Sequence, residues 1–121
     1  MTKRRNPDEL LPLTPAMFEV LIALADGEKH GYAVLKEVAR RTDGRISLSP
    51  GTLYAIVRRF VQDGVIAESD ERPDPALDDE RRRYYRLTDF GRDVALAEAR
   101  RMEMALGMAR AKSLIPKARL A

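Results

Sequence analysis

The chain has 121 residues, enough for one domain with a modest core and too few for two. Hydrophobic residues make up 45% of it and charged residues 34%, a balance that argues against a disordered chain, and the absence of cysteine excludes a disulfide framework and a thiolate metal site. The net charge of +3 is only mildly basic, so an acidic partner must be argued from where the arginines cluster. No apolar run is as long as a membrane span and no signal-peptide segment follows residues 1–5, so we expect no membrane partner and a cytoplasmic location.

The N-terminal third of the chain predicts two scaffold helices behind a loose arm. Residues 1–13 mix basic residues with prolines and show no helical period, so we expect a flexible N-terminal arm. Thr14, followed by a proline, is a helix start, and apolar residues at helical spacing continue to a breaker at Gly27. A second helix is expected to begin near His30 and to end before Gly44. Together with the next helix, it makes a helix-turn-helix.

The stretch from Ser49 to Gly64 predicts one helix with a buried face and an exposed face. Ser49 can cap the first turn, Pro50 suits the first helical position, and Gly64 supplies the stop. At about 100° per residue the apolar arc holds Leu53, Ile56, Val57 and Phe60, the far side holds Gly51, Ala55, Arg58 and Gln62, and Thr52, Tyr54 and Arg59 flank it. Small residues followed by arginines suit the major groove of DNA. An amphipathic helix with outward arginines is also the commonest helix in soluble proteins, so this helix alone decides no function.

Two short strands are expected next, over residues 65–70 and 82–87, joined by a long polar connection. A hairpin directly after such a helix is the wing of a winged helix. Alternation along the second strand places Arg83 and Tyr85 on one face and Arg82, Tyr84 and Arg86 on the other.

The connection between the strands is acidic. Its carboxylates are Asp74, Asp78, Asp79 and Glu80. Because phosphates would repel them, either the tip points away from DNA or the acids pair with Arg72 and residues 81–83 until DNA competes. We favour the first alternative for the tip. The spacing lacks the alternating acid ligands and the central glycine of an EF-hand loop, so no metal site is predicted.

The C-terminal segment predicts a long helix with two apolar stripes. Thr88 caps it, and it runs from about Phe90 to Ser113, before Pro116. One stripe holds Ala95, Ala99, Met102, Leu106 and Ala109, and the other holds Val94, Ala97, Met104 and Met108. A helix of ~24 residues spans roughly 36 Å and outruns a domain of this size. We therefore assign one stripe to the chain's own domain and the stripe from Ala95 to Ala109 to a two-fold symmetric homodimer.

The single histidine, His30, suggests a catalytic or metal-binding residue. No cysteine, second histidine or suitable nucleophile completes such a site, so a structural role at the start of a helix is favoured. We predict no catalytic residue, no cofactor and no metal, and a protein that is not an enzyme.

Four segments together resemble the PadR family of winged-helix transcriptional regulators. They are His30-Gly31-Tyr32, Ser49-Pro50-Gly51-Thr52-Leu53-Tyr54, Gly64-Val65-Ile66 and the run Arg83-Tyr84-Tyr85-Arg86-Leu87-Thr88-Asp89-Phe90-Gly91-Arg92. The resemblance extends from about residue 14 to residue 91 and implies the short type with a single C-terminal helix. Such proteins are homodimers that repress transcription, and some are released by a small aromatic or drug-like ligand. With no tryptophan and 6% aromatic residues, this chain offers such an effector little stacking surface.

We therefore expect a mainly α (α+β) fold. A winged helix-turn-helix with a two-stranded wing occupies residues 14–88, a dimerisation helix residues 89–115 and a tail residues 116–121. The predicted partners are double-stranded DNA with a palindromic operator, a second copy of the chain and a small-molecule effector implied by the resemblance. The two recognition helices would enter major grooves ~34 to 36 Å apart.

Arg58 is assigned to a base contact, because arginine can hold guanine O6 and N7 with two hydrogen bonds. Contacts to thymine methyls are assigned to Thr52 and Ala55. Phosphate contacts are assigned to Tyr32, Ser49, Tyr54, Arg59, Arg83 and Tyr84. The alternative function is a winged helix that binds another protein without sequence-specific DNA binding, which the weak net charge and the acidic wing favour slightly. A steep salt dependence of DNA binding would argue against this alternative.

Overall fold

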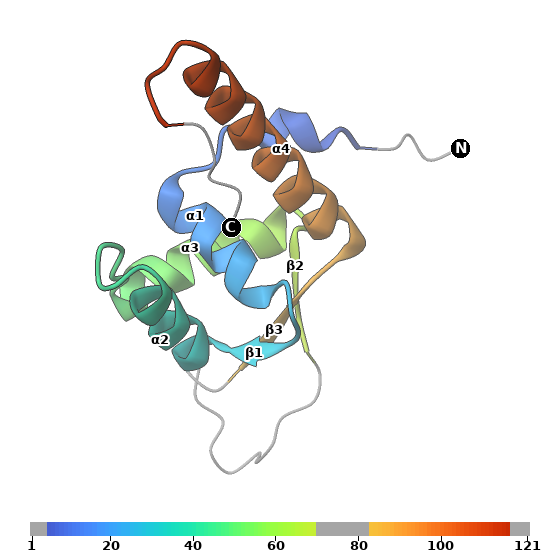
Figure 1. The fold of residues 1–121 in the computed structure, drawn as a ribbon. Helices are drawn as coiled ribbons and strands as arrows, with labels where there is room; N and C mark the ends of the chain where they lie inside the picture. The colour runs from blue at the N-terminus through green and yellow to red at the C-terminus, as the bar shows by residue number, and fades with distance from the viewer. Residues whose placement is uncertain (1–4, 70–82, 117–121) are drawn as a thin grey trace.

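The structure is a computed structural model, and it describes residues 5–69 and 83–116. The elements in chain order are η1 (Pro7–Leu10), α1 (Pro15–Leu24), β1 (Lys29–His30), α2 (Gly31–Arg41), α3 (Pro50–Gln62), β2 (Ile66–Glu68), β3 (Tyr84–Leu87) and α4 (Asp89–Ala111). Here η1 is a short 3-10 helix. Figure 1 shows α4 beside α1, with the C-terminal turns of α4 extending beyond the other helices. The expected mainly helical winged helix is confirmed.

Side-chain caps determine where the four α-helices begin. Each cap accepts a hydrogen bond from the backbone N–H three residues further on, at 2.9 to 3.1 Å. The capping residues are Thr14, His30, Ser49 and Thr88. At the end of α3, Gly64 has a φ of 75°, and the N–H of Val65 donates to the carbonyl of Phe60 at 2.8 Å. The predicted start and stop signals of α3 are therefore confirmed.

The sheet has three antiparallel strands in the order β1-β3-β2, so the expectation of a two-stranded wing was incomplete. In β2 and β3, Ile66 pairs with Leu87 and Glu68 with Tyr85. The third strand is β1, in which His30 pairs with Tyr84. A strand of two residues has no alternation to detect, which is why the sequence did not reveal it.

The core lies between α1, α2, α3, the sheet and the N-terminal half of α4. Its most buried side chains, at most 1% exposed, are Val20, Leu21, Ala23, Leu24, Val38, Leu53, Phe60, Val65 and Val94. Burying each large apolar side chain contributes about 1.5–3 kcal/mol relative to leaving it in water. Leu53, Val57 and Phe60 hold one face of α3 in this core, as the periodicity predicted. The opposite face of α3 is consequently turned outward.

The first turn of α4 touches the chain just after α3. The Thr88 N–H donates to the carbonyl of Val65 at 3.1 Å, and the Thr88 hydroxyl donates to the carbonyl of Gly64 at 2.5 Å. Gly91 is packed so closely that an added Cβ would lie 2.0 Å from the carbonyl oxygen of Val65. This junction connects α3, the wing and α4 through backbone atoms.

The segment before α1 is ordered over residues 5–13, contrary to the expected flexible arm. Leu13 is buried, and its N–H donates to Oε2 of Glu98 on α4 at 2.6 Å. Arg5 donates to the carbonyl of Asp63 and lies 4.1 Å from the ring centroid of Phe90. A 3-10 helix of four residues has no period to read, so only its packing against α4 makes it visible.

We expect Gly91→Ala to destabilise the fold by about 1–3 kcal/mol or more, because the added Cβ would overlap the backbone at Val65. Gly107→Ala on the same helix is the matched control. Nothing lies within 4 Å of its added Cβ, so removing this glycine should stabilise α4 by about 0.5–1 kcal/mol. Urea unfolding of both variants measures the difference. Equal effects would contradict the close approach of α4 to Val65.

Glu98 gives a pH-dependent prediction. Burial acts to raise the pKa of this carboxyl, but hydrogen bonds from Arg101 and from the Leu13 N–H outweigh it and hold the pKa below its usual value. A lowered pKa in the folded state means that the stabilisation is present at neutral pH and is lost as the pH falls through that pKa. Glu98→Ala should lower the free energy of unfolding by about 1–3 kcal/mol at pH 7, because the buried Leu13 N–H loses its acceptor.

Urea unfolding at neutral pH and at a pH below the lowered pKa tests this expectation. Glu98→Gln keeps an acceptor for Leu13 and should lose less stability than Glu98→Ala, and its difference from the wild type should shrink in acid. Glu103→Gln, on an exposed position of α4, is the control for removing a charge. A Glu98→Gln difference that stays constant with pH would refute the pairing.

Candidate nucleic-acid interface

The outward face of α3 begins with small residues and continues with cations. Gly51, Thr52 and Ala55 are exposed, and Arg58 follows one turn after Ala55. Arg59 has a 72% exposed side chain, and its Nε lies 4.0 Å from the carboxylate of Asp63. Such an exposed ion pair is worth little, so Arg59 is available to another anion.

Ser49 and Thr52 lie together at the start of α3. The Ser49 hydroxyl accepts from the Thr52 N–H at 3.1 Å and donates to the Thr52 hydroxyl at 2.9 Å. Both residues are exposed. The structure thus brings these two predicted DNA contacts side by side, with the Ser49 side chain already engaged in capping.

Tyr54 lies in the core, contrary to its assignment to a phosphate. Its side chain is 8% exposed, and its phenol crosses over α2 at Gly31. A Cβ at Gly31 would lie 3.0 Å from the Tyr54 hydroxyl oxygen, which explains why glycine occupies that position. From its position beside Leu53, the side chain of Tyr54 could have lain on the buried or the exposed face of α3. Packing against α2 places it in the interior.

A cluster of rings lies where β1 meets α2. The N–H of Ala33 donates to Nδ1 of His30 at 3.1 Å, which is the structural role expected for this histidine. The His30 ring is 6.5 Å from that of Tyr32, in a stacked arrangement, and 5.6 Å from that of Tyr84, edge to face. The structure therefore brings Tyr32 and Tyr84, from distant parts of the sequence, to one place.

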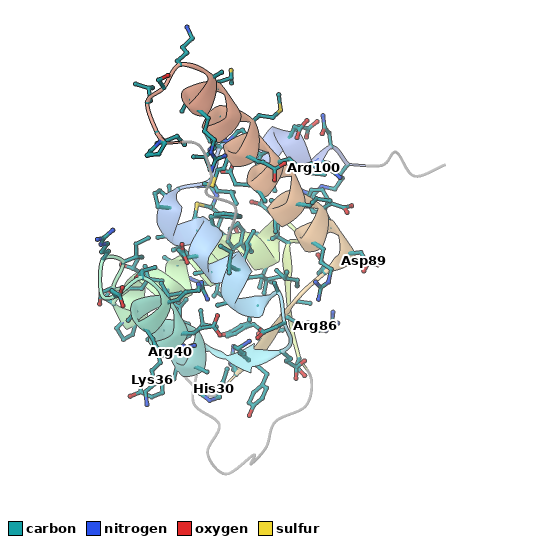
Figure 2. The ribbon with its side chains drawn as sticks, in the orientation of Figure 1. His30, Lys36, Arg40, Arg86, Asp89 and Arg100 are labelled. Carbon is teal, nitrogen blue, oxygen red and sulfur yellow. The ribbon has the colours of Figure 1, made fainter. Side chains whose placement is uncertain are left out.

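Cations extend along the outer side of α2 from this cluster. Tyr32 is 51% exposed, and Nζ of Lys36 lies 4.6 Å from the centroid of its ring. Figure 2 shows Lys36 and Arg40 on the same side of α2 with His30 at its start, while Arg100 lies away from them on α4. Lys36 was not among the predicted site residues. Its spacing of four from Tyr32 on one helix face was the signal that could have found it.

The base of the wing faces α3 across a cavity of about 250 Å³. Its lining includes Arg58 and Gln62 from α3, and Glu68 and Arg83 from the wing. Nε of Arg83 lies 3.3 Å from Oε1 of Glu68. On β3 the side chains of Tyr85 and Leu87 point inward and that of Arg86 is exposed, as alternation requires. Arg83 and Arg58 thus belong to one groove, and Glu68 is a further residue there that the sequence analysis did not single out.

The acidic connection, with Asp74, Asp78, Asp79, Glu80 and Arg82, lies outside the described residues. Within residues 5–69 and 83–116, no group of three His, Cys, Asp or Glu side chains could hold a metal ion. None of the helices in this part of the chain is long and apolar enough to cross a membrane.

The two predicted stripes of α4 are not divided as expected. Its buried residues are Gly91, Val94 and Glu98, all in the N-terminal half. Ala95, assigned to the dimer stripe, packs against the chain's own core. The other members of that stripe range from half-buried to exposed: Met102 and Ala109 are half-buried, and Ala99 and Leu106 are exposed. The exposed large apolar side chains of α4 are Leu96, Met104, Leu106 and Met108.

A comparison with known protein families decides what kind of winged helix this is. The family model described as the Transcriptional regulator PadR-like family matches residues 20–97. The chain belongs to the PadR-like family. All the predicted DNA-contacting residues, from Tyr32 to Tyr84, lie inside the matched range, whereas four of the five predicted dimer residues, Ala99, Met102, Leu106 and Ala109, lie beyond it.

Similar proteins agree with a PadR-like identity. Transcriptional regulator Rv3488 of Mycobacterium tuberculosis is 39% identical over 82 residues, which cover 68% of this chain and 69% of the relative. A PadR family transcription regulator from Clostridium difficile has a similar structure, with a TM-score of 0.65 and 21% identity over 80% of this chain and 96% of its own. Bacillus subtilis PadR in complex with operator DNA gives a TM-score of 0.59 and 17% identity over 91% of this chain and 52% of its own. These two structures show the shared PadR-like fold.

Proposed function

We propose that the chain is a transcriptional repressor that binds a palindromic operator as a homodimer. The observation that carries the proposal is the exposed face of α3, where Thr52, Ala55 and Arg58 project from a helix whose other face is held in the core. An α-helix of this kind fits the major groove. The proposal is supported by the relative from Bacillus subtilis, which was solved in complex with operator DNA.

Each residue of the proposed interface then receives one role. Arg58 contacts a guanine, and Thr52 and Ala55 contact thymine methyls. Phosphate contacts come from Tyr32, Ser49, Arg59, Arg83 and Tyr84, with Tyr54 left out because it is buried. Lys36 adds a cation beside Tyr32. Repression follows from occupying a promoter, and the protein acts in the cytoplasm with the DNA it binds.

The dimer is formed by α4 with a second copy of the chain. Four residues of the predicted dimer stripe are available for this contact. Ala99 and Leu106 are exposed, and Met102 and Ala109 are half-buried. Leu106 is 46% exposed in the single chain. Packing this stripe against its symmetry mate would bury it and separate the two α3 helices for a palindromic site. A small-molecule effector would act at this contact between the two α4 helices, where methionines offer adaptable apolar surface.

Arg58→Ala tests the base contact. We expect it to weaken binding to the operator by about 1–3 kcal/mol and to weaken binding to scrambled DNA less, because a base contact distinguishes sequences. Fluorescence anisotropy with the upstream DNA of the chain's own gene and a scrambled duplex, at two salt concentrations, measures both affinities. Arg100→Ala, which removes the same charge from α4, is the control.

Equal losses on both duplexes for Arg58→Ala would reduce its role to a phosphate contact. No binding of the wild type to either duplex, even at low salt, would refute the DNA-binding proposal and favour a protein-binding module.

Leu106→Glu tests the dimer. A charge in an apolar contact is costly, so we expect the dimer dissociation constant to rise about tenfold or more, which is ~1.4 kcal/mol. Met108→Glu is the matched control, because it makes the same change on another face of α4 where the side chain is 61% exposed. Sedimentation equilibrium measures both. A monomeric wild type, or dissociation by Met108→Glu alone, would contradict the assigned stripe.

A further inference from the structure

A carboxylate stands among the arginines of the proposed DNA-binding face. Glu68 ends β2, and its Oε1 lies 3.3 Å from Nε of Arg83. The side chains of Glu68 and Arg83 are 35% and 36% exposed. The two side chains are therefore partly exposed between the wing and α3, although Nε of Arg83 itself is buried and makes no hydrogen bond within the described residues.

The same groove contains the residue that carries the proposed base contact. Arg58 and Gln62 of α3 line the cavity of about 250 Å³ together with Glu68 and Arg83, and the apolar parts of its lining come from residues such as Val57 and Tyr85. A duplex that receives α3 in its major groove presents phosphates on either side of that helix. One of these phosphate rows would approach the groove in which Glu68 lies.

A carboxylate there opposes DNA in two ways. It repels the phosphates directly, because two like charges a few ångströms apart raise the energy of the complex where water is partly excluded. It also offsets the positive charge of Arg83 through the ion pair, which weakens the attraction of this guanidinium for a phosphate. A glutamate at this position therefore lowers the affinity for DNA, so its role in the proposed function is not to attract DNA.

We infer that Glu68 restrains sequence-independent DNA binding by competing with the phosphate backbone for Arg83. The inference rests on the proposed DNA-binding function. Non-specific affinity comes from phosphate contacts, whereas the operator is distinguished by contacts to bases. Weakening one phosphate contact therefore lowers the affinity of the protein for non-specific DNA, while the base contact that Arg58 makes with the operator stays intact.

Glu68→Gln tests the inference, because it removes the charge and keeps the size. The expected result is an affinity for scrambled DNA that is about threefold to tenfold higher at low salt. The slope of log K against log [salt] should become steeper by about 0.9, the value of one additional phosphate contact. Glu103→Gln on α4 removes the same charge far from the groove, and it should leave the slope unchanged.

A double-mutant cycle separates action through Arg83 from simple repulsion. Adding Glu68→Gln to Arg83→Ala should raise the affinity much less than Glu68→Gln does alone, because the competitor has then lost its target. Far-UV circular dichroism and thermal unfolding confirm that each variant is folded.

The inference would be overturned if Glu68→Gln had the same affinity for scrambled DNA and the same salt slope as Glu103→Gln. Weaker DNA binding by Glu68→Gln would also overturn it, because Glu68 would then be a residue that orients Arg83 for DNA. Both outcomes differ from failure of the proposed function, in which the wild type itself binds no DNA.

Discussion

The structure depends on the contact between the first turn of α4 and the backbone that follows α3. Thr88 uses both its N–H and its hydroxyl on the carbonyls of Val65 and Gly64, and its hydroxyl oxygen also caps α4. Gly91 then permits the helix to approach Val65 more closely than any side chain would allow. Because the same few backbone atoms end α3, lead into β2 and hold the first turn of α4, the direction of α4 is coupled to that of α3.

The N-terminal segment strengthens that link from the other side. Leu13 ties the chain to a carboxylate in the middle of α4, and Arg5 contacts both the end of α3 and Phe90 at the beginning of α4. Burying a carboxylate is costly unless it is paired and hydrogen-bonded, and Glu98 obtains both from Arg101 and Leu13. The segment thus belongs to the packed structure of the domain, although nothing in its sequence has a helical period.

The proposed DNA-binding face combines attraction with restraint. Arg58, Arg59 and Lys36 supply exposed positive charge, whereas Ser49 is engaged in its cap and Arg83 is paired with Glu68. A hydroxyl that already caps a helix gains less from a phosphate than a free one, and an arginine beside a carboxylate attracts a phosphate less strongly than a lone arginine. In the proposed function, these polar contacts would moderate the affinity for DNA, as would the modest net charge of the chain.

The sequence by itself determined the approximate helix boundaries and the winged-helix order, because caps, prolines, stop glycines and a 3.6-residue period are local signals that act within a few residues. The family followed from the resemblance of four short segments, and not from these signals. The sequence also determined that Arg58 and Ala55 point away from Phe60, since that follows from helix geometry alone. Only the tertiary structure decided the features that depend on contacts between distant segments. Tyr54 is in the core because Gly31 on another helix makes room for its ring, β1 exists because Tyr84 is there to pair with His30, and Ala95 is covered by the chain's own core. Such features have no local pattern, because each is set by the surface that another part of the chain presents.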